Sequence, residues 1–286
     1  MARDVILKPS LTIKQQLKLL EDKGLIIDEI DEASQFLSSN NYYRLNVYFH
    51  KLMDSKDHFI PGTIFSDIIK IYRNDSYLRQ QIFTMLEPIE IDFKSKVAYY
   101  LGNTYGSNMF YKKEIYKSSW KFEQTANTFW REISRNDNDA VVLHHYNNYS
   151  GYFPIWVIVE YLSFNAVSKY FSNLKESDQK SIAKNGFGIN EYFLGNWIHS
   201  LSVMRNICAH YGYLFKREYT VPISFGRDSK KYINQGNGLC GIFYCIKKLS
   251  TAEKWNEFLT EIFKKTGKDI LINHYNFPPD LSILIK

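Results

Sequence analysis

One long stretch of this 286-residue chain, from Ile64 to Leu101, carries apolar residues at the repeat of a single helix face. Its apolar positions follow one another at intervals of three and four: Leu78, Ile82, Met85, Ile89, Phe93, Val97 and Tyr100. These intervals place side chains on one side of an α-helix, whereas a half-buried strand would alternate. The stretch therefore predicts a long helix. Pro88 lies inside it, and because proline lacks an N–H and crowds the preceding turn, we expect a kink or a break there.

The N-terminal part predicts several short helices. Thr12 and Gln15 have the spacing of a capping box ahead of a short amphipathic helix that Gly24 would end. Two further apolar stripes follow, at Ala33–Leu37 and from Tyr42 onward. We expect a small helical unit over residues 1–60 and a larger helical domain over residues 61–286.

Helical patterns continue through the rest of the chain. The segments expected to be helical are 121–133, 154–174 with Pro154 in the first turn, a helix capped by Asn190 and stopped by Gly212, 239–249 and 252–263. The segments expected to be loops are 102–119 and 136–151, and residues 220–238 are expected to be mobile. A short strand over residues 219–224 stays open. The predicted fold class is all-α.

Composition restricts function only loosely. The formal net charge is +6 and the isoelectric point about 8.9, without a run of five basic residues, so a polyanionic partner is favoured only weakly. Three cysteines, Cys208, Cys240 and Cys245, are too few and too unevenly spaced for a disulfide framework or a four-cysteine zinc site. No secretory signal or membrane-spanning apolar run is recognisable. We expect a cytoplasmic protein without a metal or another cofactor and without a membrane partner.

The run Met204–Gly212 contains an arginine and a histidine with four residues between them. Arginine binds phosphate oxygens through a fixed fork of donors, and histidine exchanges protons near neutral pH. On an ideal helix Arg205 and His210 are about 140° apart, whereas Asn206 and His210 share a face. The arginine is long enough to reach the same cleft, so the pattern favours phosphodiester chemistry. The alternative is that both residues are surface residues or helix-terminal caps.

One protomer supplies only one histidine of this kind. Cleaving RNA without a metal needs a base for the 2′-hydroxyl proton, an acid for the leaving 5′-oxygen, and positive charge beside the developing phosphorane. A twofold dimer would bring two arginines and two histidines into one composite cleft. The chemistry therefore predicts a homodimer.

Other polar residues have competing interpretations. Glu87 and Glu90 could orient an active-site arginine, but a solvated face or a structural ion pair is favoured. Glu160 is expected to pair with a buried donor, for which Arg205 is one candidate. Cys208 is expected to pack as a small apolar group rather than act as a nucleophile. The adjacent histidines at 144 and 145 are expected to lie in a loop without metal.

Several blocks of sequence, in this order, resemble the Abi-like family of bacterial abortive-infection proteins within the HEPN superfamily of helical ribonucleases. The blocks are Lys8–Thr12, Gln16–Leu17, Asn41–Leu45, Leu78–Arg79, Leu86–Glu90, Pro154–Trp156, Glu160, Ser163–Phe164, Trp197–Leu201 and Arg205–His210. R-x-x-x-x-H alone is a weak pattern, but it is specific in this order with the other blocks. Where relatives often carry a second histidine and a basic, aromatic continuation, this chain has Tyr211–Phe215 followed by Lys216 and Arg217.

The resemblance implies a HEPN-like helical bundle, dimerisation and metal-independent RNA cleavage at Arg205, Asn206 and His210 of both chains. It also implies a role in phage defence or as a growth-arresting toxin. An antitoxin protein or a small structured RNA would then restrain the activity. Lys216 and Arg217 are candidate RNA-binding residues. The alternative is a regulatory protein that binds a structured RNA without cutting it, which the positive charge and the many tyrosines would also suit.

Overall fold

The computed structural model of the protein describes residues 9–226, 236–281 and 284, and these residues are predominantly helical. Within them, β pairing is limited to isolated bridges, so the all-α prediction is confirmed. The chain divides into two compact units: residues up to Leu78 together with Tyr213–Lys216, and Arg79–Gly212 together with the chain from Arg217 onward. The autonomy of residues 1–60 and the boundary at residue 61 stay predictions.

The first unit packs three short helices around the beginning of a long one. They are α1 (Ile13–Asp22), α2 (Ile30–Ser39), α3 (Tyr42–Lys51) and the start of α4 (Phe65–Tyr105). The Thr12–Gln15 capping box is present as predicted. Leu17, Leu37, Phe49 and Phe65 all belong to its buried core.

The segment Tyr213–Lys216 joins this first unit through Asp75, which is completely buried. The carboxylate of Asp75 accepts hydrogen bonds from the Tyr48 hydroxyl at 2.8 Å and from the backbone N–H of Leu214 at 2.6 Å. A second amide, that of Phe215, donates to the same oxygen at 3.3 Å. A buried carboxylate is costly unless its oxygens accept hydrogen bonds. These three bonds therefore stabilise the fold, and removing the donors would destabilise it.

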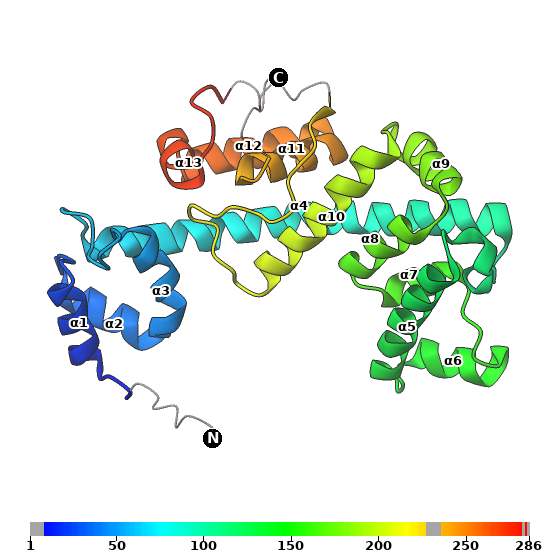
Figure 1. Ribbon diagram of the computed structural model, residues 1–286, viewed down its shortest axis with the longest axis horizontal. Helices are drawn as coiled ribbons and strands as arrows, with labels where there is room; N and C mark the ends of the chain where they lie inside the picture. Colours follow the sequence, from blue (N-terminus) through cyan, green and yellow to red (C-terminus); the bar gives the residue numbers. More distant parts are fainter. Residues whose placement is uncertain (1–8, 227–235, 282–283, 285–286) are drawn as a thin grey trace. The chain divides into compact units, whose positions relative to one another are not determined.

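Helix α4 runs without interruption through Pro88, and Figure 1 shows it as one continuous ribbon. The predicted long helix is confirmed, but the alternative of a break at the proline is wrong. Ile82, Met85, Leu86, Ile89 and Phe93 are buried along its length on both sides of Pro88. Burial of this face outweighs the local cost of the missing hydrogen bond, because helical stability in proteins comes mostly from tertiary packing.

The second unit contains the rest of α4 and all later helices. The helices are α5 (Ser119–Arg135), α6 (Ala140–Tyr149), α7 (Ile155–Tyr161), α8 (Phe164–Asn173), α9 (Glu176–Phe187), α10 (Glu191–Ala209), α11 (Leu239–Leu249), α12 (Ala252–Lys265) and α13 (Lys268–Tyr275). Two short 3-10 turns, Met109–Tyr111 and Lys113–Ile115, precede α5. Helix α10 packs against α8, α9 and α11, so it is central to this unit.

Several local predictions are wrong. Residues 140–149 form helix α6 instead of a loop, because Asp139 caps it with hydrogen bonds to the amides of Val141 and Val142. The helix expected over 154–174 is two helices, separated at Leu162 because the Ser163 side chain caps α8. Helices α9 and α13 were not expected.

The possible strand at residues 219–224 does not form. The backbone N–H groups of Tyr219 and Ile223 nevertheless donate hydrogen bonds to the carbonyls of Asn237 and Gly236, at 2.8 and 2.9 Å. Part of the segment expected to be mobile, residues 227–235, lies outside the described residues. Among the helices that the structure does describe, none combines the length and the apolar character needed to cross a membrane.

Candidate functional site at the end of helix α10

The last turns of α10 present the motif at the protein surface because the opposite face is buried. Asn190 caps the first turn by accepting a hydrogen bond from the backbone N–H of Tyr192, as predicted. Leu201, Met204 and Cys208 are buried toward the unit's interior. Residues at the intervening positions, including Arg205, therefore lie on the partly exposed side.

Arg205 lies against α4. Its Nε is 3.7 Å from a carboxylate oxygen of Glu90, and its guanidinium carbon is 5.7 Å from the centroid of the Phe83 ring. Its Nη1 donates a long hydrogen bond of 3.4 Å to the side-chain oxygen of Asn206. The arginine side chain is 34% exposed, so three contacts fix it while part of the guanidinium faces solvent. Such a cation is available to a phosphate.

Glu90 connects two cations. Besides Arg205, its carboxylate pairs with the ammonium group of Lys94 at 3.1 Å, and the Glu90 and Lys94 side chains are only 15% and 10% exposed. The structural ion pair that the sequence favoured for Glu90 is thus present with Lys94, and the same carboxylate also lies beside Arg205. Glu87 is exposed on α4 and takes no part in this network.

His210 is the C-cap residue of α10 and directly follows its last residue, Ala209. Its backbone N–H donates to the carbonyl of Asn206 at 2.9 Å, while its side chain is exposed and makes no hydrogen bond or ion pair with another described residue. The Asn206 amide contacts Arg205 instead of the imidazole. The structure therefore places Arg205 and Asn206 in contact and leaves the imidazole available to a partner.

The chain leaves α10 through a tight turn. The helix ends at Ala209, three residues before the predicted stop at Gly212. The glycine amide donates to the carbonyl of Ile207 at 2.7 Å, and a Cβ on Gly212 would lie 2.9 Å from the Ile207 side chain. Glycine is needed here for close approach. Its carbonyl accepts a hydrogen bond of 3.1 Å from the buried Arg79.

Cys208 does not behave as a nucleophile. Its side chain is buried, and its thiol lies 3.7 Å from the sulfur of Met204. Burial raises the pKa of the Cys208 thiol to about 12, although the charge of Arg79 acts in the opposite direction. The thiolate, which is the reactive form, is therefore disfavoured, as the predicted packing role requires.

The two candidate RNA-binding residues fall in different units. Lys216 belongs to the first unit, has a positive φ of 47°, and places its ammonium 5.2 Å from the Phe215 ring centroid. Arg217 belongs to the second unit and lies 5.9 Å from the Tyr219 ring centroid. Both side chains are half-buried, and each contacts an aromatic ring.

Two sequence interpretations are corrected by the packing. Glu160 is exposed on α7 and does not pair with Arg205, whose carboxylate partner is Glu90. His145 is buried in α6, bonds the carbonyl of Val141 at 2.8 Å and stacks on Phe153. In the described parts of the chain, no three His, Cys, Asp or Glu side chains gather as potential metal ligands.

The family model for the Abi-like protein matches residues 35–216, which include the end of α2, all of α3 to α10, Arg79, Glu90 and the complete motif. The chain belongs to the Abi-like protein family. Comparison with curated proteins and with solved structures found no match. Membership of the Abi-like family associates the protein with abortive infection, a form of phage defence.

Proposed function

We propose that this Abi-like protein is a metal-independent RNA endonuclease of the HEPN type that acts in phage defence or growth arrest. The observation that carries the proposal is the partly exposed Arg205, which contacts Glu90 and Asn206 and lies five residues before a histidine whose exposed side chain has no hydrogen bond to a described residue. Family membership supports the biological setting.

Each motif residue has a role in this proposal. Arg205 binds the scissile phosphate and stabilises the charge of the phosphorane. His210 of one protomer takes the 2′-hydroxyl proton, and His210 of the other protonates the leaving 5′-oxygen. Asn206 and Glu90 are positioning residues that restrict the arginine. The products would end in a 2′,3′-cyclic phosphate or a 3′-phosphate.

The homodimer follows from the proton balance of this reaction. One His210 cannot readily serve both as the base and as the acid of a single cleavage step, so the site needs two copies of the motif. A twofold axis beside the ends of two α10 helices would supply them, because an isologous interface places the same residue of each subunit about the axis.

The test is RNA cleavage in the presence of EDTA. Wild-type protein should cut RNA, whereas Arg205→Ala and His210→Ala should each lower the rate by about 100-fold or more. Arg73→Ala and His50→Ala are matched controls, because both side chains are exposed and lie in the first unit. Cleavage that persists unchanged in the motif variants would contradict the site assignment.

The second candidate is a regulatory protein that binds a structured RNA without cutting it. Lys216 and Arg217, each beside an aromatic ring, favour it because cations hold phosphates and aromatic rings stack on bases. Fluorescence anisotropy with labelled RNA would then show binding that weakens in high salt, with no new RNA ends. An antitoxin protein or a small RNA partner is compatible with either function.

A further inference from the structure

A cavity of about 550 Å³ lies between α5 and α8, on elements that the motif does not use. Its lining residues are Lys121, Gln124, Thr125, Asn127, Thr128, Leu162, Ala166, Lys169, Tyr170, Ser172 and Asn173. This volume lies within the range of small-molecule sites in proteins, which is about 300–1,000 Å³.

The charged side chains that line this cavity are all positive. Lys121 and Lys169 enter its lining from opposite helices, and no aspartate or glutamate lines it. Neither lysine forms an ion pair with any carboxylate that the structure describes; Lys121 instead lies 4.8 Å from the Trp120 ring centroid. Two uncompensated ammonium groups on facing walls favour an anionic ligand.

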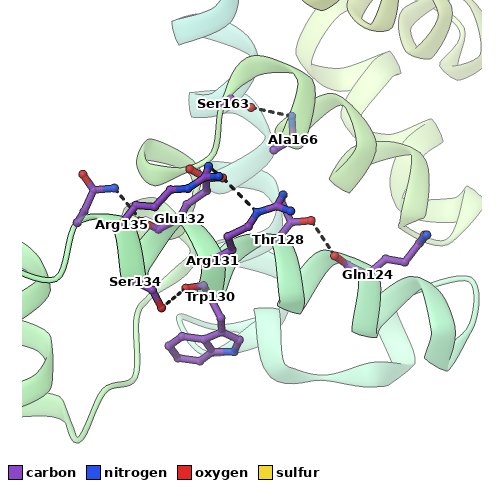
Figure 2. A network of polar contacts seen from close by, with 10 residues as sticks. Gln124, Thr128, Trp130, Arg131, Glu132, Ser134, Arg135, Ser163 and Ala166 are labelled. Carbon is purple, nitrogen blue, oxygen red and sulfur yellow. Dashed lines mark hydrogen bonds and ion pairs between the residues drawn. The ribbon is translucent and has the colours of Figure 1, made fainter. Parts of the chain in front are cut away.

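One carboxylate on α5, that of Glu132, already pairs with two arginines. Figure 2 shows Glu132 between Arg131 and Arg135, with nitrogen–oxygen distances of 3.7 and 2.8 Å. This group carries a net positive charge one or two turns beyond the cavity, so it does not compensate the two lysines. The exposed Glu123, which is nearer on α5, does not line the cavity either.

Hydrogen bonds at Asn173 fix one wall of the cavity, where α5 meets the end of α8. The amide of Lys117, just before α5, donates to the carbonyl of Asn173 at the end of α8, at 2.9 Å. The buried side chains of Asn173 and Thr125 are hydrogen-bonded at 2.9 Å. Thr125 and Asn173 both line the cavity, so this hydrogen bond joins its two walls.

The rest of the lining combines apolar surface with polar side chains. Leu162 and Ala166 supply apolar contact, and Figure 2 shows Ala166 on the segment of α8 that follows Ser163. The side-chain amides of Gln124 and Asn127 make no hydrogen bond with another described residue, so they remain available to a ligand. The Thr128 hydroxyl donates to the carbonyl of Gln124 at 2.9 Å, so the hydroxyl oxygen of Thr128 can still accept a hydrogen bond.

We propose that this cavity binds a phosphate-bearing nucleotide, with Lys121 and Lys169 on the phosphate and the apolar side chains and side-chain amides of the lining on the base. Lysine ammonium groups bind phosphate as point charges, and an amide can both donate to and accept from a base edge. The ligand is either a free nucleotide or one nucleotide of an RNA strand, because both offer the same phosphate and base. Binding here is independent of cleavage at Arg205 and His210.

The experiment measures binding of AMP and of a 5′-phosphorylated RNA decamer to the full-length protein by calorimetry. The charge variant is Lys121→Gln/Lys169→Gln, and its control is Lys184→Gln/Lys254→Gln, which removes two exposed lysines elsewhere in the same unit. The pocket variant should bind about 10-fold or more weakly, since a charge-assisted hydrogen bond contributes about 1.5–3 kcal/mol. The control pair should bind as the wild type does. All proteins carry His210→Ala, so that the RNA stays intact.

A second variant, Ala166→Phe, fills the cavity without changing charge. It should abolish binding of whichever probe the wild type binds, while the thermal unfolding midpoint shows that the fold is kept. AMP binding that both pocket variants lose supports a free-nucleotide ligand, and loss confined to the RNA decamer supports a nucleotide of an RNA strand. Failure of wild type to bind either probe, equal loss in the control pair, or full binding by Ala166→Phe would overturn the proposal.

Discussion

At the residue scale, Glu90 joins the candidate site to the interior of the second unit. Its carboxylate shares two cations, the largely buried Lys94 and the partly exposed Arg205. The carboxylate compensates the charge of the Lys94 ammonium group, which burial would otherwise penalise. The same side chain therefore contributes to stability and limits the orientations of Arg205.

We expect the Glu90–Lys94 pair to show strong coupling in a double-mutant cycle. Glu90→Gln alone should lower the free energy of unfolding by about 1–3 kcal/mol, because it leaves the Lys94 ammonium without its partner. Glu90→Gln combined with Lys94→Met should be less destabilising than the sum of the two single changes. The measurement is urea unfolding followed by circular dichroism.

The solvent-exposed pair Lys18–Asp22 provides the matched control for this cycle, since it has the same spacing of four residues with side chains 68% and 58% exposed. Its coupling should be about 0.5 kcal/mol or less. Equal coupling in the two pairs would show that burial does not strengthen the Glu90–Lys94 interaction.

At the element scale, Pro88 is an exception to the rule that proline ends a helix, because the tertiary packing of α4 keeps the helix intact. It removes one backbone hydrogen bond from α4 but does not end the helix. We expect Pro88→Ala to raise the free energy of unfolding by about 1–3 kcal/mol, because alanine restores an N–H donor and relieves the crowded turn.

Pro154 is the control for this substitution. It precedes α7 with φ of −71° and ψ of 156°, a conformation that suits proline. Pro154→Ala should therefore lower stability by about 0.4–1 kcal/mol, through greater freedom of the unfolded chain. The unfolding midpoints of the two variants should move in opposite directions; a fall in stability for Pro88→Ala would mean that the proline ring packs better than alanine.

The elements that sequence predicted well are those with a strong apolar period. The buried face of α4 and the Asn190 cap of α10 are both readable because neighbouring residues determine them. Helix α6 was missed because its histidines and asparagines resemble a loop, although Asp139 is an ordinary cap. The Arg205–Glu90 contact could not be predicted, since it joins residues far apart in sequence through packing of two helices.

At the scale of the whole molecule, the division into two units places the motif and the segment that follows it in different compact parts. Arg205 to Gly212 belong to the second unit, whereas Tyr213–Lys216 belong to the first and are bonded there by Asp75. The matching family region ends at Lys216, so it includes this return of the chain to the first unit. The matching region therefore includes part of each unit.

The proposed composite site predicts that cleavage needs one His210 from each of two protomers. Activity assays of the single variants do not test this prediction. Wild-type and His210→Ala subunits with different affinity tags should be co-expressed, and the heterodimer isolated by two successive affinity steps. If each cleavage needs both copies of His210, the heterodimer should have less than about 1% of wild-type activity, because one proton transfer lacks its catalyst. Two independent sites would instead leave about half of the activity per dimer.

Two controls make this experiment decisive. Wild-type subunits carrying both tags should keep full activity through the same purification, which excludes an effect of the tags. The His210→Ala homodimer sets the background rate. Half of the activity in the heterodimer, or the failure of any doubly tagged species to form, would contradict a site shared between two protomers. A heterodimer at the background rate would instead mean that each His210 depends on the other, as cleavage with one base and one acid requires.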